Sequence, residues 1–164
     1  MGDSGMGMID ISARDRTPRR AVAEGVLVAD AETIEAVRSG RLPKADPLAT
    51  ARAAALLAVK ATPSLVPHCH PIQVTAASVD FEFSEGSIRV TCEVHAADRT
   101  GPPMEALCGA TTALLTLYDM IKPRCPGASL QRIALVEKEG GRSGHWRAEG
   151  ADCEGGGDGS VRSD

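Results

Sequence analysis

Aromatic side chains are almost absent from this sequence, at 2% of its 164 residues. Proteins that bind single-stranded nucleic acid stack its bases on aromatic rings, so this scarcity argues against a nucleic-acid partner. Alanine, valine and leucine must fill most of the interior, and alanine-rich helices can pack close to a sheet. The few aromatic residues are Phe81, Phe83, Tyr118 and Trp146.

The sequence also lacks paired cysteine spacings, a secretory signal and a long apolar run. Its five cysteines are odd in number, and no two of them form a Cys-x-x-Cys motif. No stretch approaches the about 20 consecutive apolar residues that a membrane helix needs. We therefore expect a cytoplasmic protein with reduced thiols and no membrane partner. The cysteines are Cys69, Cys92, Cys108, Cys125 and Cys153.

Strong net charge of either sign is missing from the main body of the chain. The formal charge is −4, and residues 149–164 carry all of it, with five acidic residues against Arg162 alone. A neutral body argues against a general polyanion binder, because such proteins neutralise many phosphates at once. Any anion site must therefore come from local clustering of basic side chains.

Glycine and polar residues at both ends of the sequence predict that the chain has a central domain with a flexible segment on either side. Residues 1–7 are glycine-rich and are expected to form a flexible extension. Residues 149–164 are acidic and glycine-rich, with almost nothing to bury, and are expected to be disordered. Residues 8–148 remain as a single domain, long enough to bury a core.

Hydrophobic periodicity in residues 8–148 changes several times. Alternation predicts strands over 20–29, 72–83, 87–96 and 130–138, with Ser84, Glu85 and Gly86 forming a hairpin turn. Three- and four-residue steps predict helices over 31–37, from Pro47 through 61, and from Pro102–Pro103 through 121. Pro63 and Pro67 are expected to interrupt the chain after the second helix. These elements predict an α+β fold in which helices pack on one face of a sheet, with the strand order left open.

The third predicted helix carries charged residues at both ends. Asp119 and Lys122 are one turn apart and share a face, as in an ordinary surface ion pair. Glu105 lies fourteen residues earlier, about 21 Å along the axis. If both ends are functional, a second copy of the chain must complete the site; alternatively, Glu105 stabilises the helix dipole.

Other candidate residues are weak when taken singly. Lys44 is a loop lysine that could serve an anion site or simply be solvated. The His68-Cys69-His70 segment suggests a metal, but two histidines without a third ligand favour proton transfer or hydrogen bonding instead. The GGRSG loop, residues 140–144, lets backbone amides approach an anion beside Arg142.

Several segments read together resemble one family. They occur in order from about residue 8 to residue 147, and they are MIDISA, LPKADPLATAR, PHCHP, TGPPMEAL, ALLTLYDMIK and GGRSG. This series resembles cyclic pyranopterin monophosphate synthase, the second enzyme of molybdenum cofactor assembly.

The resemblance implies a ferredoxin-like subunit with an antiparallel sheet, assembled as a homohexamer (a trimer of dimers) with active sites at dimer interfaces. The implied enzyme is a phosphorus–oxygen lyase whose small-molecule substrate is a cyclised dihydro-GTP. Its product is a pterin fused to a pyran ring, with a cyclic phosphate, and pyrophosphate leaves. The resemblance implies no metal and no organic cofactor.

The resemblance also implies which residues of this chain form the site, from their positions within the matching motifs. As catalytic groups the resemblance implies Lys44, His70, Asp119 and Lys122. Its implied substrate-binding residues are Arg19, Cys69, His70, Met104, Glu105 and Arg142. Ring opening and closure need proton donors and acceptors, and a leaving pyrophosphate needs cations, so these residue types suit the reaction.

This sequence departs from the family pattern at several positions. Pro102 and Pro103 replace a valine and a glutamate, and Arg142 replaces a lysine, which keeps the charge but cannot give up a proton. Alanine at position 45 replaces a glycine, and His68 replaces a leucine. These departures leave open a paralogue that binds a nucleotide or pterin without turnover, an enzyme for a related phosphorylated substrate, and a structural partner in mixed oligomers.

Overall fold

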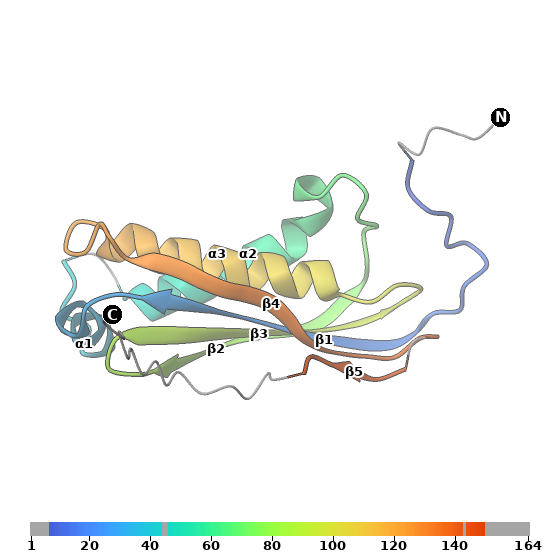
Figure 1. The fold of residues 1–164 in the computed structure, drawn as a ribbon. Coiled ribbons are helices and arrows are strands. Elements are labelled where there is room, and N and C mark those ends of the chain that lie inside the picture. Colours follow the sequence, from blue (N-terminus) through green and yellow to red (C-terminus); the bar gives the residue numbers. More distant parts are fainter. Residues whose placement is uncertain (1–6, 44–45, 143, 150–164) are drawn as a thin grey trace, which may run out of the picture.

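The computed structural model describes residues 7–43, 46–142 and 144–149. One sheet and two long helices form two layers (Figure 1). Residues 1–6 and 150–164, which include most of the predicted extension and tail, lie outside the described residues, as does Lys44. Within the described residues, no helix has the length and apolar character needed to cross a membrane.

The sheet has five antiparallel strands in the order β2-β3-β1-β4-β5. With the intervening helices, the first four strands follow the βαββαβ order of a ferredoxin-like fold, which confirms the expected α+β class. The short β5 was not predicted, because two residues carry no alternation. The strands are β1 Thr17–Val28, β2 Val74–Phe83, β3 Ser87–Asp98, β4 Ser129–Glu139 and β5 Trp146–Arg147.

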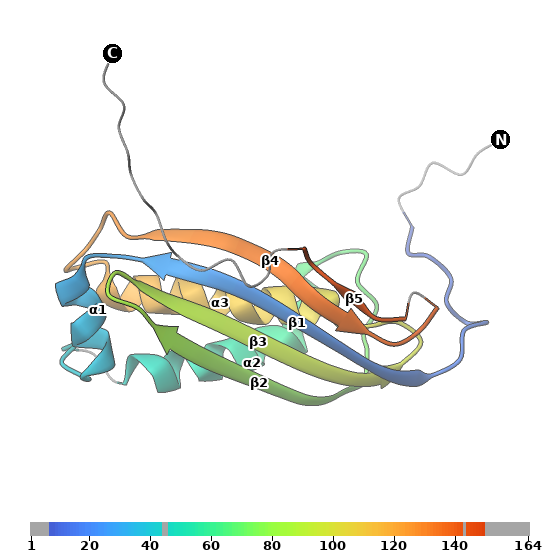
Figure 2. The ribbon, with the colours of Figure 1, turned by 60° about the horizontal axis from the view of Figure 1, so that its bottom comes forward.

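The helices are α1 Ala31–Arg38, α2 Pro47–Leu65 and α3 Pro103–Ile121. Figure 2 shows α2 and α3 behind the sheet, covering one face and leaving the other face open. Aspartates begin the first two helices: Asp30 accepts a hydrogen bond from the Thr33 amide at 2.8 Å, and Asp46 accepts one from the Leu48 amide at 2.9 Å. Such caps satisfy amides that have no partner within the helix.

The core lies between the sheet and the two long helices, and small residues let these layers approach closely. A Cβ atom placed on Gly109 of α3 would lie 2.5 Å from Cys92 Sγ in β3 and 2.9 Å from Val59 Cγ2 in α2. Alternate residues of β3 point into the core, and α3 contributes alanines and leucines. The fully buried members of this set include Ile88, Val90, Val94, Ala106, Ala110, Ala113, Leu114 and Leu117.

Helix α2 is longer than the sequence predicts. Pro63 was expected to interrupt the chain, but the helix runs through it to Leu65. Pro63 lies in the last turn, where the missing amide removes only one hydrogen bond of the helix. The Val66 amide donates to the Thr62 carbonyl at 2.9 Å, which closes the helix one residue later. The other long elements begin and end within three residues of their predicted bounds.

Candidate active site

The start of α3 and the start of β1 lie at the same end of the molecule, beside the end of β4 (Figure 1). Most of the predicted substrate-binding residues lie there. Met104 and Glu105 are in the first turn of α3, Arg19 is in β1, and Arg142 follows β4. Cys69 and His70 lie in the loop between α2 and β2, and the Cys69 thiol reaches Glu105. The fold therefore gathers these six residues from four separate segments.

Arg19 and Arg142 line one cavity of about 330 Å³ at this end. A second cavity of similar volume, lined in part by Thr17 and Gly141, shares Arg14, Arg19 and Arg142 with the first. The first cavity is lined by Arg14, Arg19, Arg20, Thr100, Gly101, Pro103, Lys138, Glu139, Gly140 and Arg142. Five of these ten residues are cations and one is an anion. This is the local clustering that an anion site requires in a chain whose main body is neutral.

Four of the five cations remain available to a ligand. Within the described residues, Arg14, Arg19, Lys138 and Arg142 take part in no ion pair with a carboxylate. A phosphate or pyrophosphate in this cavity would meet unneutralised positive charge from three directions: the segment before β1, the start of β1, and the end of β4 with its following loop. Guanidinium groups bind phosphate oxygens through paired hydrogen bonds, which suits such a ligand.

Arg20 has a different role. Its Nε and Nη2 donate to Glu93 Oε1 and Oε2 at 2.8 and 2.9 Å, and Nη1 lies 3.1 Å from Glu137 Oε2 and 3.3 Å from Glu139 Oε1. The hydrogen bonds from Glu93 raise the pKa of the Arg20 guanidinium above its usual range. Because three carboxylates already share its charge, Arg20 stabilises the pairing of β3, β1 and β4 and leaves ligand binding to its neighbours.

Glu105 is buried, with a side chain only 1% exposed. The Cys69 thiol donates to Glu105 Oε1 at 3.5 Å, and the carboxyl lines a cavity of about 330 Å³ beside Lys60 and Gln73. Burial raises the pKa of Glu105, and its own backbone amide offsets only part of that effect. Burial and then Glu105 raise the pKa of Cys69 to about 11. The pair is therefore a neutral thiol beside a carboxyl that holds its proton more tightly than usual.

His70 is half-buried in the loop that carries Cys69, whereas His68 is exposed. Asp10 lies near this loop: hydrogen bonds from Ser12 lower the pKa of Asp10, and the charges of Arg99 and His70 lower it further. Asp10 belongs to the MIDISA segment, so the fold brings the first and third matching motifs together. Asp10 was not predicted as a neighbour of His70, because nothing local in the sequence connects them.

Neither His68 nor His70 belongs to a metal-like cluster in the described part of the chain. The only such group there comprises Glu137, Glu139 and His145, whose ligand atoms lie within 4.8 Å of one another. The His145 Nε2 is 2.8 Å from Glu137 Oε1, and Arg20 already pairs with both carboxylates. The geometry of this group is therefore explained by a hydrogen-bonded ion network between β4 and the residues around β5.

Asp119 and Lys122 lie at the opposite end of α3. Lys122 Nζ is 2.7 Å from Asp119 Oδ1, and both side chains are about half exposed. The carboxylate of Asp119 raises the pKa of Lys122. The predicted one-turn pair is confirmed, and so is its separation from Glu105, since a straight helix of 1.5 Å per residue places about 21 Å between them. These two groups of residues do not form one compact site within a single chain.

With this geometry in place, comparison with known proteins identifies the family. The model of the MoaC family matches residues 8–141. This chain belongs to the MoaC family. Cyclic pyranopterin monophosphate synthase 2 of Mycobacterium tuberculosis is 46% identical over 139 residues, which is 85% of this chain and 83% of that protein. The cyclic pyranopterin monophosphate synthase of Novosphingobium aromaticivorans is 43% identical over 141 residues, 86% of this chain and 90% of that protein.

A third relative gives the same result. The cyclic pyranopterin monophosphate synthase of Thermomicrobium roseum is 43% identical over 144 residues, which is 87% of each chain. The resemblance that the motifs indicated is therefore confirmed across almost the whole described chain. These three relatives are all named cyclic pyranopterin monophosphate synthases.

Three basic residues of the cation-lined cavity of this MoaC-family chain were missed by the sequence analysis. Arg14 precedes β1, Arg20 follows Arg19 within it, and Lys138 lies opposite Ala21 on β4. Arg14 directly follows the MIDISA motif, and Lys138 lies two residues before GGRSG, so proximity to the motifs was a usable signal. Their convergence required the pairing of β1 with β4.

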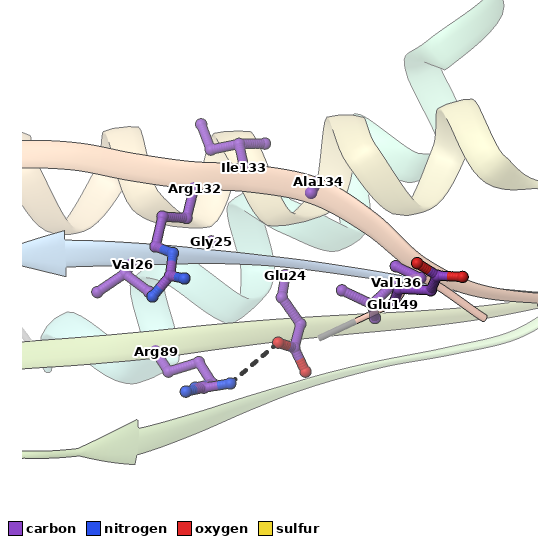
Figure 3. Close-up of a pocket in the computed structure, with 10 residues that line it drawn as sticks. Glu24, Gly25, Val26, Arg89, Arg132, Ile133, Ala134, Val136 and Glu149 are labelled. Atoms are coloured by element: carbon purple, nitrogen blue, oxygen red, sulfur yellow. Dashed lines mark hydrogen bonds and ion pairs between the residues drawn. The ribbon is translucent and has the colours of Figure 1, made fainter. Parts of the chain in front are cut away.

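The open face of the sheet holds another cavity, of about 380 Å³ (Figure 3). Arg89 Nη1 lies 3.2 Å from Glu24 Oε2, and Arg132 lies beside this pair with a positive φ of 53°. The pairing of β1 and β4 shifts register next to Arg132, which is typical of a β-bulge. Among the residues that the structure describes, none of the predicted site residues lines this cavity.

Proposed function

We propose that this chain is a cyclic pyranopterin monophosphate synthase of molybdenum cofactor biosynthesis. In this proposal it converts a cyclised dihydro-GTP to cyclic pyranopterin monophosphate and releases pyrophosphate, as a phosphorus–oxygen lyase. The observation that carries the proposal is the convergence of Arg19 and Arg142, from opposite ends of the chain, on one cation-lined cavity. Membership of a family whose named members are such synthases supports the substrate.

The cavity accounts for the phosphate chemistry. Arg14, Arg19, Lys138 and Arg142 lie in its walls without carboxylate partners in the described residues, so they can bind the substrate's phosphates and stabilise the charge on pyrophosphate as it leaves. Met104 and the Cys69–His70 loop lie at the same end and would bind the rest of the substrate. We assign no metal or organic cofactor to the reaction, because side chains supply both the charges and the proton carriers.

Proton transfer is assigned to Asp119, Lys122 and His70, together with Lys44. Asp119 holds Lys122 in a fixed ion pair at 2.7 Å, which orients the ammonium and keeps it protonated until a substrate group displaces the carboxylate. The predicted charge arrangement needs Asp119 and Lys122 near the phosphates, yet in one chain they lie about 21 Å along α3 from Glu105 at its start. We therefore propose that the C-terminal end of α3 from a second copy completes each site.

A dimer related by a twofold axis would build two such sites, because each chain would contribute the start of its α3 to one and the end to the other. The resemblance extends this to a homohexamer made of three dimers, located in the cytoplasm. Exposed apolar side chains on the helices, including Leu57 at 67% and Leu115 at 53%, offer surface for contacts between copies.

Pro103 favours one alternative function, namely ligand binding without catalysis. It lines the cation-lined cavity at the position where the family usually has a glutamate, so an acidic group is absent from this wall. A cavity with less negative charge would still bind a phosphorylated ligand, and could bind it more tightly, while lacking one proton carrier. The alternative is a paralogue that binds the nucleotide or pterin without turnover.

The decisive experiment is to supply the pure protein with enzymatically prepared cyclised dihydro-GTP and to measure pyrophosphate and pterin product together. Formation of both in equal amounts is the expected result. Tight binding without either product would replace the synthase with the non-catalytic paralogue. Absence of both binding and product would remove the proposed substrate altogether.

A further inference from the structure

The first two glycines of the GGRSG loop lie against the start of β1. Gly140 and Gly141 have φ values of 95° and 70°, a backbone region that residues with side chains rarely adopt. A Cβ atom on Gly140 would meet the Pro18 carbonyl oxygen and would lie 3.0 Å from Arg19 Cδ. The loop backbone therefore crosses the start of β1 at a distance that leaves no room for a side chain at position 140.

Gly141 makes a more specific contact. A Cβ atom built on it would lie 2.5 Å from Arg19 Cζ and 2.8 Å from Arg19 Nη2, too close to the guanidinium for both to keep their places. The guanidinium of Arg19 thus occupies the volume that any side chain at position 141 would need. Two hydrogen bonds hold it there, from Nε to Thr17 Oγ1 at 2.8 Å and from Nη2 to the Arg99 carbonyl at 3.4 Å.

Arg19 therefore lies in the wall that the two neighbouring cavities share. Arg142, which directly follows Gly141 in the loop, lines both cavities as well. A free arginine would lose rotamer freedom on binding an anion, whereas a guanidinium already held by Thr17, the Arg99 carbonyl and Gly141 loses less. Gly141 therefore affects the anion affinity of the cavity indirectly, by leaving room for the Arg19 guanidinium.

We propose that Gly141 is a positioning residue for pyrophosphate binding, because its missing side chain lets the Arg19 guanidinium lie against the loop and face the anion. The inference rests on the proposed function only for the identity of the anion. The position of the guanidinium depends on the contacts of Arg19 alone, so the two parts can be tested separately.

The test compares Gly141→Ala with Gly40→Ala in the full-length protein. Gly40 has a similar φ of 65°, but a Cβ there would meet nothing within 4 Å, so it carries the backbone cost without the contact. We expect Gly141→Ala to move the ¹⁵N–¹H signal of the Arg19 Nε group and to weaken pyrophosphate binding at least about tenfold. Gly40→Ala should leave the signal in place and the affinity within about twofold, as expected for a site remote from the ligand.

A double-mutant cycle separates positioning from loop damage. In an Arg19→Ala background, Gly141→Ala should cause no further loss of pyrophosphate affinity beyond that caused by Gly40→Ala. Additive losses from Gly141→Ala and Arg19→Ala would overturn the inference, as would a Gly141→Ala protein that behaves like Gly40→Ala. In turnover, the expected change is a higher KM for the substrate with a smaller change in kcat.

The wild-type protein distinguishes this inference from the proposed function. If the Arg19 signal moves in Gly141→Ala but the wild-type protein binds no pyrophosphate, the positioning of Arg19 is supported and the assigned anion is wrong. If the wild-type protein binds pyrophosphate and Gly141→Ala binds it equally well, the anion site is supported and the role of Gly141 is wrong.

Discussion

Each end of helix α3 carries a carboxyl side chain, and one is buried whereas the other is exposed to solvent. Glu105, in the first turn, is 1% exposed and has a raised pKa, whereas the side chain of Asp119, near the last turn, is 55% exposed and pairs with Lys122. The first end lies beside a cation-lined cavity and a loop of histidines, and the second end carries a charged pair in water. Burial at one end raises the pKa of a carboxyl, and exposure at the other leaves a charged pair accessible.

This difference explains why neither end forms a complete site alone. The beginning of α3 lies beside the cations that would bind phosphate, but its acidic group, Glu105, is buried. The end of α3 has an accessible ammonium–carboxylate pair, but about 21 Å of helix separates Asp119 from Glu105. A second copy that places the exposed end of its α3 near the cation-lined cavity would supply what the first lacks.

The largest expected effect comes from removing the ammonium at the exposed end. Lys122→Ala should lower kcat by about a thousandfold, the scale of a lost general acid or base, without changing the melting temperature. The matched control is Arg124→Ala, which breaks another exposed ion pair at the same end, with Glu32 at 2.7 Å. Steady-state turnover and thermal melting would check this, and unchanged turnover would remove Lys122 from the mechanism.

The next prediction tests whether the two ends belong to one site across two chains. Arg19→Ala and Lys122→Ala proteins should each be nearly inactive, because each lacks one half of every site. When the two chains are refolded together at equal amounts, about a quarter of the wild-type sites should be intact, since half of the dimers are mixed and each has one good site. Activity that stays at the level of the separate proteins would show that both ends act within one chain.

A smaller effect is expected from restoring the family's lysine near the cavity. Arg142→Lys keeps the positive charge beside Arg19, so pyrophosphate affinity should change by about threefold or less, the cost of a lost bidentate contact at a solvated site. Isothermal titration would measure the affinity, with Arg142→Ala as the neutral comparison. A large rise in kcat for Arg142→Lys would instead mean that this position transfers a proton, which an arginine cannot do.

The smallest effect concerns stability at the buried end. Because burial raises the pKa of Glu105 in the folded state, its protonated form stabilises the protein fully below the unfolded pKa near 4.5, and that contribution is lost as pH rises through the folded pKa. Glu105→Gln keeps an acceptor for the Cys69 thiol and cannot ionise. It should flatten the pH dependence and raise the melting temperature by a few degrees above neutral pH.

Melting curves across pH would measure this effect, with Glu85→Gln as the control, because Glu85 is exposed in the turn between β2 and β3. The control should follow the wild-type curve. A Glu105→Gln protein with the same pH dependence as the wild type would show that the pKa of Glu105 is the same in the folded and unfolded states, and that burial at this end of α3 has no electrostatic effect on the carboxyl.

The sequence by itself determined the elements and the spacing within them. Alternation and helical period predicted four strands and three helices, because side-chain direction along one element depends on local backbone geometry. The Asp119–Lys122 pair followed from one helical turn, and the motifs indicated the family. Pro63 was the local exception, since a proline in a last helical turn removes only one hydrogen bond and does not end the helix there.

The tertiary structure alone decided which charges from distant segments meet. Arg20 bonds to Glu139 across 119 positions of sequence, and the same pairing of β1 with β4 brings Arg19 against Gly141 and Lys138 opposite Ala21. Burial of Glu105 likewise depends on the loop that packs over it. Strand order, register and loop packing depend on contacts summed over the whole core, so no local sequence pattern encodes them. The bounds of each helix and strand, in contrast, depend mainly on the residues close by in the sequence.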